Sequence, residues 1–376
     1  DTDYALLPPT ETEADIHVEE YTARITNGKI TAELTVDSWS HSCDIAFYNQ
    51  KGALLLKEAG KGGALDKKNR FFKPIIGGDY RLTVTFASNP KEKLYGMGQY
   101  QQDILNVKNC NLELAHRNSQ ASVPFVLSDL GYGFLWHNPA IGRVSFASNT
   151  TEWYAESTEQ MDYWITAGET PAEILENYTA VSGRPGEFPK WASGFWQSKL
   201  RYHNQEEVLE TAREYKRRGL PLSVIVIDFF HWKHQGDWSF DPEYFPDPQA
   251  MVDELKEMGV ELMVSVWPTV EPYSENYARL KQLGFLTRAD RGVRTQYHCL
   301  GAQVFFDPTT QGAREFLYEK LKENYGKYGI RIFWLDEAEP GFTTYDYDNY
   351  RCRMGTQAQV GNLSVSYTHL TLPTIA

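Results

Sequence analysis

The sequence predicts a β-sandwich followed by about the first half of a (β/α)₈ TIM barrel. Residues from about 15 to 165 form short alternating runs, whereas residues from about 191 onward alternate between apolar strands and amphipathic helices. About four strand–helix repeats can be counted, and a closed barrel has eight. We therefore expect a sandwich domain with a short linker over residues 1–185 and half a barrel over residues 191–362.

The sandwich is predicted by period-two alternation of apolar and polar residues, interrupted by turn sequences such as NGK, NQKG and SNP. The alternating runs are 17–26, 29–38, 43–49, 80–87, 123–138 and 142–148. Their spacing of about ten residues is typical of an antiparallel sandwich. A helix is then expected over 170–183, because a Thr-Pro pair opens an amphipathic segment, and the Pro-rich stretch 184–190 is a linker.

The barrel is predicted by nearly continuous apolar strands, which indicate a parallel sheet covered by helices. The expected strands are 193–199, 221–230, 260–268 and 330–340, the expected helices are 204–219, 247–259, 274–284 and 309–329, and 302–308 is an extended segment. A doubly wound sheet is the alternative, but no Gly-rich phosphate turn follows a first strand. Polar and aromatic residues gather where the strands end, as they do in a barrel.

Composition excludes several classes of protein. The chain has 376 residues, 41% of them hydrophobic and 23% charged, which is normal for globular proteins. No apolar run approaches the length of a membrane span, and a net charge of −13 disfavours nucleic acid as a partner. The four cysteines have no metal-finger spacing, so we expect a reducing, cytoplasmic location. Aromatic residues make up 14%, and several stand beside carboxylates in loops, as in sugar sites.

Carboxylates at strand ends are the strongest chemical signal. Asp336 ends an apolar strand, Glu337 and Glu339 follow it, and Trp334 points to the same side of that strand as Asp336. Asp228 ends a neighbouring strand in the same way. A strand-end acid can also be a simple cap or a surface charge. Two acids walled by aromatic rings nevertheless fit glycoside cleavage, which needs one carboxylate at the anomeric carbon and one acid for the leaving oxygen.

Two other kinds of site are weighed against this interpretation. His231, His234 and Asp237 lie close together, but the two histidines lack the spacing of metal ligands on a helix. A serine triad has no GxSxG motif to start from. We therefore predict neither a metal nor a cofactor.

The motifs together resemble glycoside hydrolase family 31, the retaining α-glucosidases and α-xylosidases. The resemblance runs to about residue 362 and includes LYGMGQY (94–100), VPF (123–125), GYGFLWHN (131–138), GFWQSKLRY (194–202), VIDFFHW (226–232), DWSFDPEYFPDP (237–248), SVWP (265–268) and FWLDEAEP (333–340). It implies a galactose-mutarotase-like sandwich, a (β/α)₈ barrel and small β domains after it. The combination looks most like the α-xylosidases that act on xyloglucan-type oligosaccharides.

The resemblance implies the catalytic residues. Asp336 matches the nucleophile of the family's W-x-D-x-x-E motif, and Trp334 and Glu339 match its flanking positions. The nucleophile would form a covalent β-glycosyl intermediate that water opens with retention of configuration. The family's acid/base Asp lies on a later barrel strand, so we expect it to be missing from these residues and the chain alone to be inactive.

The resemblance also implies the residues that bind the sugar. Asp228 matches the strand-end acid that hydrogen-bonds hydroxyls of the cleaved sugar, Trp267 matches an aromatic wall, and Trp232 adds a second wall. The expected partner is an oligosaccharide with a terminal α-linked xylose or glucose. A homo-oligomer of the full-length protein is left open.

The last fourteen residues, 363–376, have a different character from the rest. They contain no Asp, Glu, Lys or Arg, with His369 as the only basic side chain, they show no helical period, and the resemblance stops where they begin. They form either a short Thr-rich strand or a segment that is not native sequence, and we favour the second interpretation.

The sequence leaves three functions open. The first is an exo-acting α-xylosidase that uses double displacement. The second is an α-glucosidase or α-transglucosylase of the same family. The third is a relative that binds carbohydrate and does not cleave it.

Overall fold

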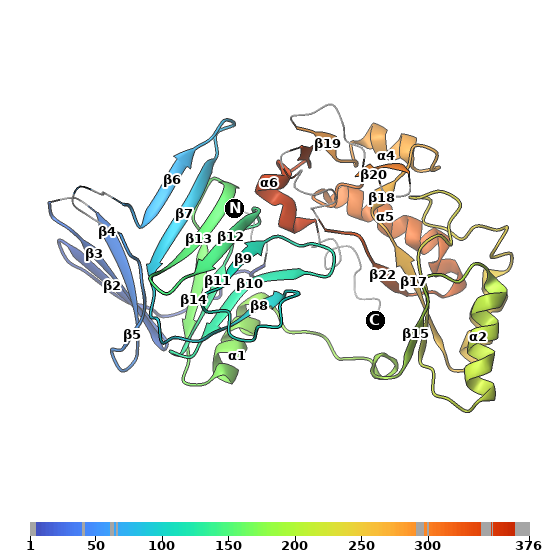
Figure 1. The fold of residues 1–376 in the computed structure, drawn as a ribbon, viewed down its shortest axis with the longest axis horizontal. Coiled ribbons are helices and arrows are strands. Elements are labelled where there is room, and N and C mark those ends of the chain that lie inside the picture. The colour runs from blue at the N-terminus through green and yellow to red at the C-terminus, as the bar shows by residue number, and fades with distance from the viewer. Residues whose placement is uncertain are drawn as a thin grey trace. The chain divides into compact units, whose positions relative to one another are not determined.

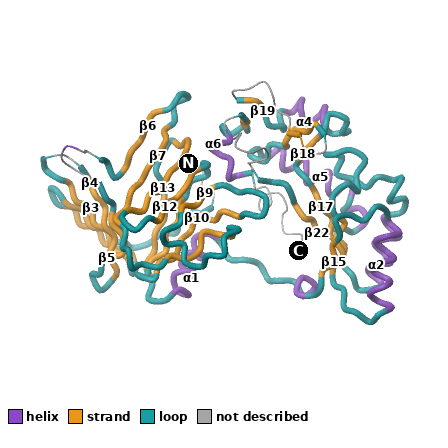
Figure 2. The backbone as a smooth tube through the Cα atoms, viewed as in Figure 1, coloured by secondary structure: helices purple, strands orange, loops and turns teal. Residues whose placement is uncertain are grey.

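The computed structural model describes residues 5–39, 42–60, 64, 67–290, 297–298, 301–339, 347 and 349–364. Two compact units make up the chain, and each is described by itself (Figure 1). The first comprises residues up to Pro185 together with Ala358–Asn362, and the second begins at Gly186 and includes the described residues 363 and 364. Strands dominate the first unit, whereas helices and strands alternate in the second (Figure 2). Most of the tail 363–376 and Cys299 lie outside the described residues.

The first unit is built from three antiparallel sheets. The first sheet has the order β1 (Asp15–Val18), β2 (Thr22–Asn27), β3 (Ile30–Val36), β4 (Cys43–Asn49) and β5 (Leu54–Lys57). The second has the order β14 (Tyr163–Ala167), β11 (Tyr132–Trp136), β10 (Ala121–Ser128) and β8 (Leu94–Gln99). The third has the order β6 (Arg70–Pro74), β7 (Tyr80–Ala87), β13 (Thr150–Thr158), β12 (Gly142–Phe146) and β9 (Asn111–Leu114).

The alternation of inward-facing and outward-facing side chains along the strands explains the core of this unit. On β7, the side chains of Leu82, Val84 and Phe86 are fully buried, because every second residue of a strand faces the same side of its sheet. Aromatic rings fill the core, and Trp136 stacks on Trp153 with 5.7 Å between ring centroids. The predicted β-sandwich is therefore confirmed.

Close strand contact requires a glycine at one point of this unit. Gly142 begins β12, and a Cβ atom added there would lie 2.0 Å from the carbonyl oxygen of Tyr154 on β13. Helix α1 (Pro171–Ser182) follows the sheets. The hydroxyl of Thr170 caps it by accepting from the backbone amide of Glu173 at 3.2 Å, and proline occupies the first helical turn, as predicted.

A four-stranded parallel sheet forms the centre of the second unit. Its strands lie in chain order, β15 (Trp196–Ser198), β16 (Val224–Ile227), β17 (Glu261–Val266) and β22 (Ile332–Leu335). The sheet thus adds each new parallel strand beside the previous one, without the reversal of strand order that defines a doubly wound fold. This confirms the predicted first part of a (β/α)₈ barrel over the doubly wound alternative.

Side chains cap three helices of the second unit, α2 (Gln205–Arg217), α3 (Pro248–Glu257) and α5 (Gln311–Asn324), whereas α4 (Tyr277–Leu283) begins without a side-chain cap. The 3₁₀ turns Lys190–Ser193 and Gly326–Tyr328 also belong to this unit, while most of the short α6 (Gln357–Val360) and of the 3₁₀ turn Gly361–Leu363 is assigned to the first unit. Asn204 and Asp247 accept the backbone amides of Glu207 and Ala250 at 2.9 and 3.0 Å. The apolar faces of the helices pack against one side of the parallel sheet in a single buried cluster, which includes Val208, Met251 and Ile225.

Short antiparallel strands complete the second unit. The extended segment predicted over 302–308 contains β21 (Ala302–Phe305), which pairs with β18 (Thr269–Val270) and β20 (Tyr297–His298) outside the parallel sheet. Another pair is β19 (Arg288–Ala289) with β23 (Tyr350–Arg351). Within the described part of the chain, no helix combines the length and the apolar character that a membrane crossing requires.

Candidate active site

Strand register places the candidate site residues on one face of the parallel sheet. Ser265 on β17 lies opposite Trp334 on β22, and Val226 on β16 lies opposite Met263. Continuing this register by one residue past β16 puts Asp228 beside Ser265, and continuing it past β22 puts Asp336 beside Trp267. All of these side chains lie on the face of the sheet that points away from the helices.

Two buried clusters identify the faces. Ile227 and Val264 belong to the large cluster shared with the helices, whereas Val226, Met263 and Ile332 form a separate cluster on the other face. Residues two positions further along each strand therefore continue this second face at its carboxyl edge. A parallel βα sheet carries ligand-binding groups at that edge.

Asp228 is held at the end of β16 by the turn that follows it. Its Oδ1 accepts the backbone amide of Phe229 at 2.8 Å. Partial burial raises the pKa of the Asp228 carboxyl above its ordinary value, and the negative charge of Asp336 raises it further. The hydrogen bond from the Phe229 amide opposes this rise in pKa. Asp228 and Asp336 thus lie within electrostatic reach of each other.

Asp336 is the centre of a group of acids. Its backbone amide donates to the carbonyl of Val266 at 3.0 Å, which extends the pairing of β17 with β22 by one residue. Burial raises the pKa of Glu337 to about 7, and the charges of Glu339 and Asp336 add to the rise. Burial also raises the pKa of Glu339, again with a contribution from Asp336. A proton is therefore held more tightly on both glutamates than in water.

Aromatic rings stand beside these acids. Trp267 is 5% exposed, and its ring stacks on Phe229 at 5.1 Å and meets the edge of Trp232 at 6.2 Å. Trp232 is itself buried, whereas Trp334 is 47% exposed on the sheet face that carries Asp336. The structure thus brings Trp267, Trp232 and Asp228 together around one turn, and it brings Trp334 beside Asp336.

The three residues weighed as metal ligands have other partners. Nδ1 of His231 lies 2.9 Å from the carbonyl oxygen of Asp228, and Nε2 lies 2.7 Å from the hydroxyl of Tyr325. Nδ1 of His234 lies 2.8 Å from Glu271, and Asp237 accepts the backbone amide of His234 at 3.0 Å. Among the described residues, no three or more His, Cys, Asp or Glu side chains are arranged to hold a metal ion.

Three neighbours of the site were missed by sequence reasoning. Strand alternation could have found Ser265, because it lies two residues before Trp267 on the same strand. Phe229 could have been found from its position directly after Asp228. Nothing in the sequence pattern connects Tyr325 with His231, because 94 residues separate them.

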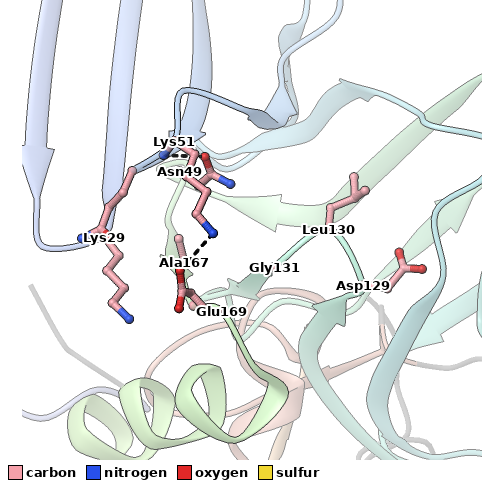
Figure 3. A pocket seen from close by; sticks show the side chains of 10 residues that line it. Lys29, Asn49, Lys51, Asp129, Leu130, Gly131, Ala167 and Glu169 are labelled. Carbon is pink, nitrogen blue, oxygen red and sulfur yellow. Dashed lines mark hydrogen bonds and ion pairs between the residues drawn. The ribbon is translucent and has the colours of Figure 1, made fainter.

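A polar hollow also lies in the first unit (Figure 3). Its volume is about 230 Å³, and none of the residues that line it is aromatic. Lys51 pairs with Glu169 across it at 3.2 Å. Because saccharide sites combine polar groups with apolar rings, this hollow is a weaker candidate than the strand-end site.

Known proteins are similar to this chain in sequence. A family model for the TIM-barrel domain of glycosyl hydrolases family 31 matches residues 185–371. An uncharacterised family 31 glucosidase of Pseudescherichia vulneris is 51% identical over 96% of this chain and 70% of its own length. Alpha-xylosidase A of Aspergillus niger is 36% identical over 74% of this chain and 38% of its own length.

Solved structures give the same result. The crystal structure of a family 31 α-xylosidase from a soil metagenome, complexed with xylose, matches with a TM-score of 0.93 and 51% identity. The match covers 99% of this chain and 57% of that one. A xylosidase from Aspergillus niger matches with a TM-score of 0.83 and 32% identity over 92% of this chain and 51% of its own. The chain thus spans between 38% and 70% of the lengths of these four relatives.

Proposed function

Since the chain belongs to glycoside hydrolase family 31, we propose that it carries the nucleophile and the sugar-binding side of a retaining, exo-acting α-xylosidase. The observation that carries the proposal is the pair Asp228 and Asp336. Asp228 follows β16 and Asp336 follows β22, the strands on either side of β17, so the sequence expectation that they end neighbouring strands is wrong by one strand. The two acids lie on one face of the sheet, interact electrostatically and are flanked by Trp267 and Trp334. Such a pair suits a sugar ring, which offers hydroxyls at its rim and apolar C–H faces.

Asp336 acts as the nucleophile in this proposal. Its carboxylate oxygen forms a bond to the anomeric carbon while the bond to the leaving oxygen breaks, and that oxygen takes a proton from a general acid. Water then opens the β-glycosyl ester, so the configuration is retained. Glu339 lies beside Asp336 and has a raised pKa, so it can hold a proton next to the nucleophile. We assign no residue of this chain as the general acid.

Asp228 and the rings bind the sugar in this proposal. The carboxylate of Asp228 accepts hydrogen bonds from sugar hydroxyls, and its fixed turn makes these bonds directional. Trp267 and Trp232 pack as one wall, and Trp334 offers a second, half-exposed ring. The partner is an oligosaccharide with a terminal α-linked xylose, and the protein acts in the cytoplasm.

The names of the similar proteins support xylose as the terminal sugar, because several of them are α-xylosidases. An α-glucosidase or α-transglucosylase is the second candidate, and Alpha-glucosidase 2 of Bacillus thermoamyloliquefaciens, 26% identical, favours it. Product analysis with xylosyl and glucosyl oligosaccharides separates these activities. Analysis at high sugar concentration separates hydrolysis from transfer.

Covalent labelling tests the proposal directly. A mechanism-based fluoroglycoside with a fluoride leaving group needs little acid catalysis, so it reports on the nucleophile alone. We expect peptide mass spectrometry of the full-length gene product to locate the label on Asp336, and Asp336→Asn to abolish it. A label on another residue would contradict the assignment. Sugar binding without any label would favour the non-catalytic carbohydrate-binding relative.

A further inference from the structure

A fully buried histidine joins the turn that carries Asp228 to a distant helix. The side chain of His231 is 1% exposed, and Tyr325, which directly follows α5, is completely buried. The imidazole lies between the Asp228 carbonyl, 2.9 Å from Nδ1, and the Tyr325 hydroxyl, 2.7 Å from Nε2. One side chain therefore links the end of β16 to the end of α5.

The partners fix the tautomer of this histidine. A backbone carbonyl oxygen can only accept, so the proton must sit on Nδ1 of His231 and be donated to Asp228. Nε2 then carries a lone pair and accepts from the hydroxyl of Tyr325. Both nitrogens of a neutral ring are thus satisfied, as burial in an apolar core requires.

The turn itself has a backbone conformation that needs support. Phe230 has a φ of 63°, in the left-handed region that bulky residues rarely adopt. Two side chains of the proposed sugar site, Asp228 and Trp232, lie on or next to this turn, and so does Phe229, on which the Trp267 ring stacks. The hydrogen bond from His231 to Asp228 closes the turn across this strained residue.

An apolar side chain could fill the space of the His231 ring, and it would not bring two buried nitrogen atoms that need hydrogen-bond partners. The ring of His231 packs among other rings, with centroid distances of 4.7 Å to Trp232 and 5.3 Å to Phe240. A phenylalanine or leucine would suit such surroundings on packing grounds alone, because a buried polar group is costly unless fully hydrogen-bonded. A histidine at position 231 is explained if its two hydrogen bonds set the geometry of the turn.

We infer that His231, held by Tyr325, is a positioning residue that sets the orientation of the Asp228 carboxylate toward the sugar. The inference rests on the proposed function, because it gives Asp228 the role of binding sugar hydroxyls. His231 acts through the backbone of Asp228 and does not touch the sugar.

Three variants of the full-length gene product test it. His231→Leu removes both hydrogen bonds, His231→Asn keeps a donor near the Nδ1 position, and Tyr325→Phe removes only the second partner. We expect His231→Leu to raise the Kd for xylose, measured by calorimetry, at least about tenfold, and His231→Asn to restore it to within about threefold. Tyr325→Phe should lie between them. Tyr132→Phe is the matched control, because it removes a buried tyrosine hydroxyl that donates to Glu92 at 2.7 Å in the first unit.

A double-mutant cycle separates positioning from general destabilisation. If His231 acts through Asp228, the variant Asp228→Asn/His231→Leu should bind xylose no more weakly than Asp228→Asn alone. Additive losses, or full affinity in His231→Leu, would overturn the inference. Amide hydrogen exchange at Phe229 gives a readout without sugar, and it should accelerate in His231→Leu but not in Tyr132→Phe. An unchanged exchange rate would likewise overturn it.

Failure of the proposed function gives different results from failure of the inference about His231. If the wild-type protein neither binds xylose nor is labelled on Asp336, the proposed function fails and the inference fails with it. If the wild-type protein binds xylose and His231→Leu binds it equally well, only the inference fails. Should His231→Leu not fold, the comparison of Tyr325→Phe with Tyr132→Phe decides the matter.

Discussion

Acidification should selectively weaken the second unit through His231. Burial lowers the pKa of this histidine from 6.5 to about 4, against the opposing effect of its hydrogen bond to Asp228. Because the folded pKa lies below the unfolded one, the stability that neutral His231 contributes is present above pH 6.5 and is lost as the pH falls toward 4. At about 1.4 kcal/mol for each pKa unit, the loss amounts to about 3 kcal/mol.

The assay compares the wild type with His231→Asn, whose side chain does not titrate. Urea unfolding of both proteins is followed by tryptophan fluorescence at several values between pH 7 and pH 4. Carboxylates that titrate in the same window contribute equally to both proteins, so they cancel in the difference. We expect the stability advantage of the wild type to shrink by about 3 kcal/mol across the window.

The reasoning would be refuted if this difference stayed constant from pH 7 to pH 4. Tyr100→Phe provides the control, because it removes a hydrogen bond from the Tyr100 hydroxyl to the backbone carbonyl of Glu113, 2.6 Å long, and this acceptor does not titrate. Its stability deficit relative to the wild type should therefore be the same at every pH. A deficit in Tyr100→Phe that changes as much as that of His231→Asn would show that the effect does not come from His231.

Four further substitutions test the site and the fold. Asp336→Asn should lower turnover of an aryl α-xyloside by about 10⁴-fold or more and leave the calorimetric Kd for xylose within about threefold of the wild-type value. Unchanged turnover would exclude Asp336 as the nucleophile. Trp267→Ala should raise that Kd at least about tenfold, because it removes the packed ring of the sugar wall. The folded-state pKa of Glu337 is raised, so the wild type loses stability as the pH rises from 4.5 to 7. Over this range the unfolding free energy of Glu337→Gln, measured with urea, should increase by about 1 kcal/mol relative to that of the wild type, because partial exposure of Glu337 reduces the effect. Gly142→Ala should cost about 2 kcal/mol or more in unfolding free energy, whereas Gly186→Ala, with no atom within 4 Å of the added Cβ, should cost almost nothing.

Much of the fold could be predicted because it depends on local patterns. The Thr-Pro start of α1 and the Asp-Pro start of α3 are capped helix starts that a sequence shows directly. The apolar run of β16 identified a strand buried on both faces, and every residue from Val224 to Ile227 is buried. Strand alternation also predicted that Trp334 and Asp336 share one side of β22. These inferences need only neighbouring residues.

The rest depends on contacts between distant residues, which leave no local pattern. The segment 302–308 looks like any extended run, yet β21 within it pairs with β18 more than thirty positions earlier and not with the parallel sheet. The partner of His231 is Tyr325, whose position after α5 follows from helix packing. Left-handed backbone at Glu337 is likewise invisible in the sequence, because a glutamate gives no sign of a positive φ.

Strain and charge are concentrated at the same edge of the parallel sheet, and this is best explained by function. Four of the seven non-glycine residues with positive φ in the described part of the chain, Arg201, Phe230, Trp238 and Glu337, lie in segments that follow strands of this sheet. The acids there have raised pKa values, so their charged forms are destabilised at neutral pH. A sequence selected for stability alone would relax both features. Substitutions that remove an acid from this edge should therefore stabilise the second unit while they weaken sugar binding or cleavage, whereas equivalent substitutions in the sandwich should only destabilise the first unit.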